Sequence, residues 1–299
     1  MNTLVVVLGP TGVGKTAAAI RLAHRYTCPI LNADSRQIYR DIPIGTAAPT
    51  AAERAAVPHY FVARLPLTEY YSAARYEQEA LSLLADLFRR HEVCLMVGGS
   101  MMYIDALCNG LDEIPTVDAE TRGLLRNRYV REGLPPLLEE LRLLDPAYYE
   151  RCDRRNPQRV IHALEIYYMT GRPFSSFHKS ANVRRPFRIV KIGLRRERPE
   201  LFARIGWRVD EMVRCGLLDE ARRVLPFRSC NALNTVGYKE LFRHFDGEWT
   251  LDFALDKIRR NTRVYAKKQM TWFKKDPSVA WFSPDDLPAI EHHLAALGL

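Results

Sequence analysis

Residues 4–16 read LVVVLGPTGVGKT, an apolar run that gives way to glycines and then to Gly-Lys-Thr at positions 14–16. A continuous β-branched and apolar run that ends at glycine indicates a buried strand, here residues 3–8. The residues from 16 to about 26 are typical of a helix that follows the loop directly. This stretch therefore predicts a strand, a glycine-rich loop and a helix, in that order.

The glycine-rich loop matches the pattern G-x-x-x-x-G-K-[ST], which is typical of loops that hold phosphates. Its glycines let backbone N–H groups converge on phosphate oxygens, and the N-terminus of the following helix adds a favourable field. Lys15 supplies a positive charge, and the Thr16 hydroxyl can bind Mg²⁺. The predicted diphosphate site consists of Gly9, Pro10, Thr11, Gly12, Val13, Gly14, Lys15 and Thr16.

The loop pattern alone leaves the identity of the phosphate compound open. A nucleotide-hydrolysing protein usually has a second apolar strand that ends in an acidic residue serving the metal. Here the apolar stretch 92–97 is followed by Gly98, Gly99 and Ser100, with no acid. The strand-end carboxylate is instead Asp34, which could serve the metal, act as a general base beside the phosphates, or cap a helix.

Length and composition are those of a globular protein with one large domain, or with a domain that carries an insertion. The chain has 299 residues, of which 47% are hydrophobic and 10% aromatic. No stretch approaches the roughly 20 apolar residues that span a bilayer, and the N-terminus has no cationic leader, so we expect no membrane segment and no signal peptide. The six cysteines form no C-x-x-C pair, which favours a reduced, cytoplasmic protein over a cysteine metal site.

The net charge of +9 is concentrated in the second half of the chain. Residues 151–275 hold 29 Lys and Arg against 13 Asp and Glu, whereas residues 1–150 are close to neutral. This asymmetry favours a polyanionic partner, nucleic acid first, over a plain solvated basic surface. The strongest candidate is a helix at about 251–275 that carries Arg259, Arg260, Arg263, Lys267, Lys268, Lys274 and Lys275 among the aromatic residues Tyr265, Trp272 and Phe273. For Trp272 we favour core packing over contact with nucleic acid.

Strands alternate with helices in the first part of the chain. A second buried strand lies within residues 28–35, and residues 70–91 predict a long helix with Ser72 as its N-cap before the strand at 92–97. This alternation predicts a parallel sheet with functional groups at the carboxyl ends of its strands. From about Pro115 the alternation stops, and residues 118–180 are typical of helices.

The alternation resumes with a strand within residues 185–196. Helices then follow at 199–215, 217–225 and about 251–275. We therefore predict an α/β protein with a P-loop NTPase-like parallel-sheet core, flanked by helices and interrupted by a mainly helical insertion domain. The predicted parts are 1–115 for the first part of the core, 116–183 for the insertion, and 184–299 for the second part with its basic helices.

Six motifs in matching order resemble the tRNA dimethylallyltransferases, over nearly the whole chain. They are the P-loop, ADSRQIYRDIPIGTAAP (33–49), VGGSMMYIDAL (97–107), NPQRVIHALEIYYMTGRP (156–173), VGYKEL (236–241) and RRNTRVYAKKQMTWFKK (259–275). In that family the P-loop holds the pyrophosphate of dimethylallyl diphosphate rather than ATP. The prenyl group is transferred to the exocyclic N6 of the adenosine just 3′ of the anticodon, at tRNA position 37.

The resemblance implies roles for individual residues. An exocyclic aromatic amine is a poor nucleophile, so a carboxylate should take its proton, and Asp34 matches the family's catalytic aspartate. The leaving pyrophosphate would be stabilised by Lys15, the loop amides, Mg²⁺ at Thr16, and Arg208. The target base must leave its stack, which costs less in a single-stranded anticodon loop than in a duplex. The implied partners are tRNA and dimethylallyl diphosphate, and we expect a monomer.

The residues that match the family's tRNA contacts lie in six segments of the chain, with Arg122 separate from Gln158–His162. They are Asp34, Ser35, Arg36 and Gln37; Ser100; Arg122, Gln158, Arg159, Val160, Ile161 and His162; Asn234, Gly237, Tyr238 and Lys239; and Lys267, Lys268, Gln269, Trp272 and Lys274. Three of them depart from the family pattern, with Ser100 in place of threonine and His162 and Lys239 in place of arginines. Ser100 keeps a hydroxyl, so a contact to the base or ribose is still expected, whereas His162 and Lys239 bear only on single phosphate contacts and leave the implied reaction unchanged.

Two other functions are each consistent with part of the sequence. The loop by itself suggests an ATP-dependent small-molecule kinase, but such an enzyme has no need of a basic half-chain. The loop together with the basic half suggests a nucleic-acid-binding ATPase, but the strand at 92–97 lacks the terminal acid. ATP binding at the loop is therefore the alternative to dimethylallyl diphosphate.

Overall fold

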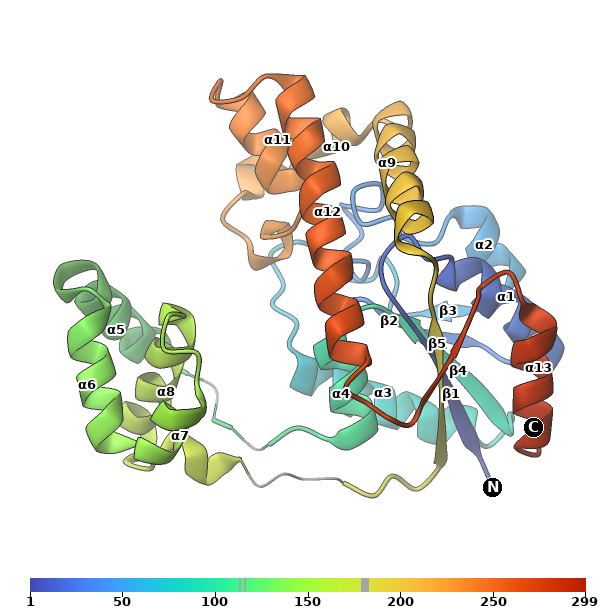
Figure 1. The fold of residues 1–299 in the computed structure, drawn as a ribbon, viewed down its shortest axis with the longest axis horizontal. Coiled ribbons are helices and arrows are strands. Elements are labelled where there is room, and N and C mark those ends of the chain that lie inside the picture. Colours follow the sequence, from blue (N-terminus) through green and yellow to red (C-terminus); the bar gives the residue numbers. More distant parts are fainter. Residues whose placement is uncertain (113, 116, 179–182) are drawn as a thin grey trace. The chain divides into compact units, whose positions relative to one another are not determined.

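The computed structural model divides the chain into two compact units (Figure 1). The first combines Met1–Cys108 with Arg185–Leu299, and the second is Asn109–Arg184. The structure describes residues 1–112, 114–115, 117–178 and 183–299. Residue 116, the predicted start of the insertion, and residues 179–180, the predicted end of its helical stretch, lie outside these ranges.

The described part of the first unit contains one parallel six-stranded sheet in the order β3-β2-β4-β1-β5-β6. The strands are β1 (Thr3–Leu8), β2 (Ile30–Ala33), β3 (His59–Tyr60), β4 (Val93–Gly98), β5 (Arg188–Leu194) and β6 (Val279–Phe282). The predicted α/β fold with a parallel core is thus confirmed. The strand β1 lies between β4 and β5, and every one of its residues is buried, which explains its unbroken apolar run.

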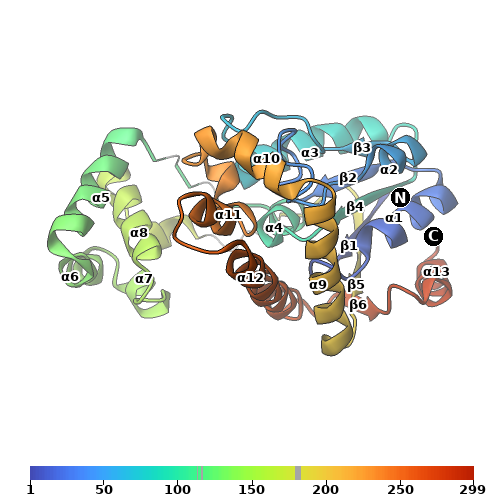
Figure 2. The same cartoon turned by 90° about the horizontal axis from the view of Figure 1, so that it is seen from above.

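Alternate residues of β1 pack into two separate hydrophobic cores, because successive side chains in a strand point to opposite faces. Leu4, Val6 and Leu8 belong to the core formed with α3 (Ala73–Leu87) and α4 (Met101–Asn109). Val5 and Val7 belong to the core formed with α1 (Lys15–Tyr26) and α13 (Leu287–Ala296). Figure 2 shows α1 beside α13 on one side of the sheet, with α3 and α4 on the other side.

Helix boundaries follow local capping signals. The predicted cap at Ser72 is confirmed, because its side chain accepts a hydrogen bond from the Arg75 N–H at the start of α3. The remaining helices of the first unit are α2 (Ala51–Ala56), α9 (Arg198–Arg214), α10 (Leu217–Val224), α11 (Tyr238–Phe245) and α12 (Leu251–Phe273). Two short 3₁₀ turns, Leu225–Phe227 and Asn231–Leu233, precede α11.

The second unit is helical throughout its described elements and has a hydrophobic core of its own. Its core includes Leu125, Leu137, Leu141 and Leu164. The buried carboxylate of Asp145 accepts from the N–H groups of Tyr148 and Ser175 and so holds two segments together. The elements are α5 (Ala119–Glu132), α6 (Leu134–Leu144), α7 (Pro146–Arg151), α8 (Pro157–Thr170) and a 3₁₀ turn, Phe174–Phe177.

The longest helix in the described ranges, α12, is strongly charged, and none of the helices there has the length and apolarity that a membrane crossing requires.

Candidate active site

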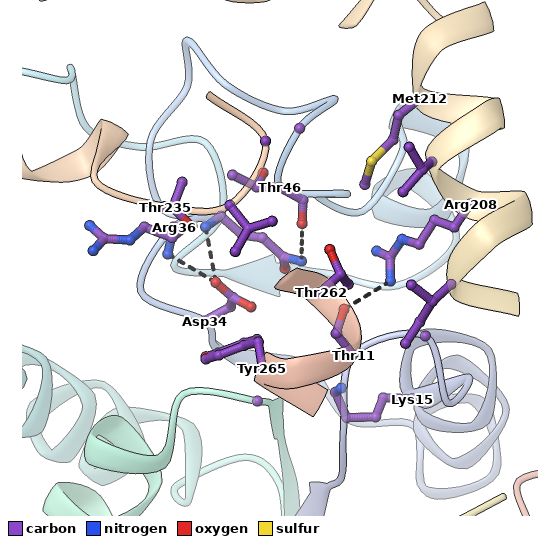
Figure 3. Close-up of a pocket in the computed structure, with 18 of the residues that line it drawn as sticks. Thr11, Lys15, Asp34, Arg36, Thr46, Arg208, Met212, Thr235, Thr262 and Tyr265 are labelled. Carbon is purple, nitrogen blue, oxygen red and sulfur yellow. Dashed lines mark hydrogen bonds between the residues drawn. The ribbon is translucent and has the colours of Figure 1, made fainter. Parts of the chain in front are cut away.

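A pocket of about 590 Å³ opens at the carboxyl ends of β1, β2 and β4. It lies entirely within the first unit, where parallel strands place functional groups at one edge of the sheet. Its walls come from the loop after β1, the turn after β2, and one face each of α9 and α12. In Figure 3 the side chains of Lys15, Asp34 and Arg208 come from three of these walls toward a common space.

The loop after β1 has the backbone that its glycines predict. Gly9 has a φ of 149°, and a Cβ there would lie 2.7 Å from the Leu194 carbonyl oxygen of β5, so only glycine fits. Gly14 has a φ of 111° and serves as the N-cap of α1, whose N-terminal N–H groups are suited to an anion. The loop therefore begins a helix at the edge of the pocket, as residues 9–16 predict.

The ammonium group of Lys15 turns back onto its own loop. Its Nζ donates to the carbonyl oxygens of Gly9 and Pro10, each at 2.9 Å. Burial, and then the positive charge of Arg208, lower the pKa of Lys15 to about 8, and the charge of Asp34 acts in the opposite direction. A bound diphosphate would add negative charge and raise this pKa again.

This titration predicts a pH dependence of pyrophosphate binding. As the pH rises from about 8 toward the ordinary lysine value of 10.5, the empty protein loses the Lys15 charge, so its affinity for inorganic pyrophosphate should fall and binding should take up a proton. Calorimetry in two buffers of different ionisation enthalpy measures both effects. Lys15→Met should bind more weakly than the wild type at pH 7, approach wild-type affinity as the pH rises, and lose the proton uptake of Lys15. Equal proton uptake by the wild type and this variant would contradict the prediction.

The two carboxylate oxygens of Asp34 have different surroundings. Oδ1 accepts from the backbone N–H of Arg36 at 2.9 Å and of Gln37 at 3.4 Å, which fixes the turn after β2. Oδ2 accepts no hydrogen bond from the described part of the chain, and Figure 3 shows the carboxylate in the pocket beside Tyr265. The side chain therefore caps a turn rather than the start of a helix, and its second oxygen remains available to the pocket.

Arg208 reaches the loop from α9, more than 190 residues along the chain. Its Nη1 donates to the Thr11 hydroxyl and its Nη2 to the Ala47 carbonyl, both at 3.4 Å. Burial lowers the pKa of Arg208, and the charge of Asp34 opposes this shift. Two cations, Lys15 and Arg208, thus line the same pocket, and they are near enough for the charge of Arg208 to lower the pKa of Lys15.

Two predicted RNA-contacting residues instead connect the loops of the site. The buried Gln269 accepts from the Thr11 N–H at 2.9 Å and donates to the Gly99 carbonyl at 2.8 Å, so its amide joins the P-loop to the end of β4. Ser100 is 7% exposed, and its hydroxyl oxygen accepts from the Ser35 N–H at 2.8 Å. In this structure both side chains hold protein groups, which explains why polar residues occupy buried positions.

The side chains of three other residues that were predicted to contact RNA are buried in this structure. Val160 and Ile161 pack in the core of the second unit, and Tyr238 is fully buried in the first. The expected core packing of Trp272 is wrong. Its ring is 38% exposed, and its Nε1 donates to Asp105 at 2.8 Å.

The remaining predicted RNA-contacting residues fall into three places. Arg36, Gln37, Asn234, Gly237 and Lys239 line the pocket together with Asp34 and Ser35. Lys267, Lys268 and Lys274 are exposed on or just after α12. The second unit contains Arg122, Gln158, Arg159 and His162. There the carboxylate of the buried Glu165 lies 3.2 Å from Nδ1 of His162 and 3.9 Å from Nε of Arg122.

Two pocket residues of α12, Ile258 and Thr262, were not among the candidates from the sequence, whereas Tyr265 was expected among the aromatic residues of this basic helix. On α12 the residues Ile258, Thr262 and Tyr265 line the pocket together with Gln269. Their spacing of three or four residues is a helical-face signal that points to one side of α12. Burial, and then the charge of Asp34, raise the pKa of Tyr265 to about 12, so its hydroxyl stays protonated beside the carboxylate.

A metal at Thr16, as predicted, would have few ligands from the described part of the chain. The described residues contain no group of three or more His, Cys, Asp or Glu side chains that could form a protein cage for a metal. Mg²⁺ needs no such cage, since it commonly takes one or two protein oxygens, substrate phosphates and water. The Thr16 hydroxyl and the Asp34 carboxylate line the same pocket and supply donors of that kind.

The fold and the pocket together define an α/β protein in which a P-loop-like glycine-rich loop, a carboxylate and an arginine line one cavity. A family model described as IPP transferase matches residues 37–276. A tRNA dimethylallyltransferase 2 of Parabacteroides distasonis is 57% identical over 295 residues, which cover 99% of each chain. The chain therefore belongs to the IPP transferase family, that of the tRNA dimethylallyltransferases, and it is a prenyl-transferring enzyme.

Solved structures agree with this assignment. The full-length tRNA isopentenylpyrophosphate transferase from Bacillus halodurans is 34% identical, with a TM-score of 0.73 over 99% of this chain and 96% of that one. A eukaryotic dimethylallyltransferase, studied by crystallography as it acts on tRNA, has a TM-score of 0.81 at 26% identity. That match covers 96% of this chain and 75% of the eukaryotic one.

Proposed function

We propose that this enzyme transfers the dimethylallyl group of dimethylallyl diphosphate to N6 of adenosine 37, just 3′ of the anticodon of a tRNA, and releases pyrophosphate. The observation that carries the proposal is the convergence of the P-loop, Asp34 and Arg208 on one pocket. The P-loop and Arg208 suit the diphosphate end of the donor. The free oxygen of Asp34 suits the amine end of the acceptor.

The reaction breaks the bond between the allylic carbon and the diphosphate oxygen, and it forms a bond from that carbon to N6. The Oδ2 of Asp34 accepts the N6 proton, so the nitrogen does not retain a positive charge. Negative charge that develops on the leaving diphosphate is stabilised by the loop amides, Lys15 and Arg208. Mg²⁺ held by Thr16 would neutralise further charge on the leaving group.

Capture of tRNA is assigned to the basic residues of α12 and of the second unit, together with the turn 34–37. The net charge of +9 favours a polyanion, and phosphate contacts by Lys and Arg supply affinity that falls with salt. The target adenine has to leave its stack to enter the pocket, as single-stranded loop bases readily do. Tyr265 and Arg36 lie beside Asp34 in Figure 3, where a base would enter.

The deciding experiment incubates the enzyme with unmodified tRNA, dimethylallyl diphosphate and Mg²⁺, followed by nucleoside mass analysis. The proposal requires a mass increment of one dimethylallyl group on adenosine at position 37. Thermal shift with dimethylallyl diphosphate or ATP, each with Mg²⁺, separates this function from an ATP-dependent kinase. Stabilisation by ATP alone, with no prenylated adenosine, would favour the kinase.

The exposed cation Lys268 tests the assignment of α12 to tRNA. Lys268→Ala should weaken tRNA binding and lower the slope of log affinity against log salt by about one, because one phosphate contact is lost. Pyrophosphate binding should not change. Filter binding or anisotropy over a salt series measures the slope, with Arg21→Ala on α1 as an exposed-cation control. A loss of affinity that does not depend on salt would indicate a packing role for Lys268.

A further inference from the structure

A buried carboxylate outside the pocket has no cationic partner among the described residues. Glu220 of α10 is 1% exposed and accepts three hydrogen bonds. Its donors are the backbone N–H of Ile44 at 2.9 Å, the backbone N–H of Gly45 at 2.8 Å, and the hydroxyl of Tyr238 at 2.5 Å. Burying a carboxylate costs free energy unless hydrogen bonds compensate the lost hydration. These three hydrogen bonds supply that compensation for Glu220.

The backbone that Glu220 holds is the loop 42–47, and this loop also contacts two residues of the pocket. The carbonyl oxygens of Thr46 and Ala47 each accept from Nε2 of Gln37 at 3.0 Å. The Ala47 carbonyl also accepts from Arg208 at 3.4 Å. One short loop therefore connects the turn that carries Asp34 to the arginine on the diphosphate side.

Tyr238 packs closely against the loop 42–47 at Gly45. A Cβ added to Gly45 would lie 2.4 Å from the Tyr238 hydroxyl oxygen, and the Tyr238 side chain is fully buried. Burial, and then the charge of Glu220, raise the pKa of Tyr238, so its hydroxyl stays a donor to the carboxylate. The Glu220 carboxylate thus accepts one hydrogen bond from the Tyr238 hydroxyl of α11 and two from backbone N–H groups of the loop 42–47.

We propose that Glu220, together with Tyr238, is a positioning residue of the prenyl-transfer site. It fixes the loop 42–47, whose carbonyl oxygens place Gln37 beside Asp34 and orient Arg208 toward the diphosphate. This inference rests on the proposed function for its catalytic consequence. It assigns to Tyr238 a place behind the pocket rather than a direct contact with RNA.

The test compares three variants of the full chain. Glu220→Gln places an amide, itself a donor, among three donors, whereas Tyr238→Phe removes a single hydroxyl. Tyr76→Phe is the matched control, because Tyr76 is fully buried and its hydroxyl has no hydrogen-bond partner in the described structure. The measurements are kcat, KM for dimethylallyl diphosphate, Kd for tRNA, Kd for inorganic pyrophosphate, and the thermal midpoint.

We expect Glu220→Gln to lower kcat/KM for dimethylallyl diphosphate by about 10- to 100-fold, as losses of residues that orient a site commonly do. Tyr238→Phe should lower it by about fivefold, the usual effect of one hydrogen bond. In both variants the pyrophosphate Kd should rise while the tRNA Kd changes by less than about twofold. Tyr76→Phe should alter none of these constants, whatever its thermal midpoint.

A purely structural role predicts a different pattern. If Glu220→Gln and Tyr238→Phe lower only the thermal midpoint and retain the kinetic and pyrophosphate constants of Tyr76→Phe, the positioning role is wrong. If Glu220→Gln does not fold, Tyr238→Phe decides alone. If the wild type transfers no prenyl group, the proposed function fails, and the pyrophosphate Kd of the same variants still decides the positioning role, since unchanged values would overturn it.

Discussion

Asp34→Asn is expected to lower kcat by about 10²- to 10⁴-fold, the contribution of a positioned general base. Asparagine retains an oxygen that can accept from the N–H groups of Arg36 and Gln37, so the turn should keep its conformation. The amide cannot take a proton from N6, and the step that depends on this transfer slows. Binding of tRNA and of pyrophosphate should change little. Single-turnover assays with saturating tRNA and dimethylallyl diphosphate measure the loss directly.

Asp41→Asn is the matched control for this substitution. Asp41 is a half-buried carboxylate a few residues further along the chain, where it accepts from the Leu67 N–H outside the pocket lining. Its replacement should leave the single-turnover rate within about twofold of the wild type. An Asp34→Asn enzyme with normal turnover would remove this residue from the base role, whereas lost tRNA binding would point to a contact with RNA instead.

Arg208→Ala is expected to lower kcat by about 10²- to 10³-fold, the range seen when one donor to a developing negative charge is removed. The guanidinium lies within reach of Thr11 in the P-loop and is held by the Ala47 carbonyl. Because charge on the diphosphate increases toward the transition state, kcat should fall more than the affinity for dimethylallyl diphosphate. Arg208→Lys should recover only part of the rate, since an ammonium group lacks the planar fork of donors.

Arg214→Ala is the control for a lost arginine on the same helix. Its side chain is 66% exposed and pairs with Glu211 near the end of α9, so the kinetic constants should stay at wild-type values. A rise in KM with unchanged kcat for Arg208→Ala would mean that the arginine binds the substrate and the transition state equally. That outcome would contradict a specific role in departure of the leaving group.

Local signals along the chain were sufficient for the core of the fold. The apolar run of β1 and the glycines of the loop predict the strand, the turn and the helix α1 that the structure contains. Short elements were not predicted, among them β3 with two residues and β6 with four. Such short runs bury too little apolar surface to produce a period, and pairing with neighbouring strands stabilises them.

The polar residues of the site illustrate the limit of pattern reading. Ser100, Tyr238 and Gln269 occur in motifs that resemble RNA contacts, yet the structure has them hydrogen-bonded inside the protein. Whether a polar side chain faces solvent or satisfies a buried group depends on neighbours that are distant in the chain. Gln269 bonds to Thr11, which lies 258 residues earlier in the sequence. No local window contains that information.

The sequence by itself determined a parallel-sheet core, a glycine-rich loop and helix start at the end of β1, a carboxylate at the end of β2, and a basic second half. These properties are local, because they follow from side-chain periodicity, from glycine backbone freedom and from net charge. Only the tertiary structure decided which groups meet. It brings Arg208 to the P-loop, places Asp34 in the wall of the same pocket, and hydrogen-bonds the loop 42–47 to Glu220. These contacts join distant segments, and their energy depends on burial and hydrogen-bond geometry that exist only once the chain is packed.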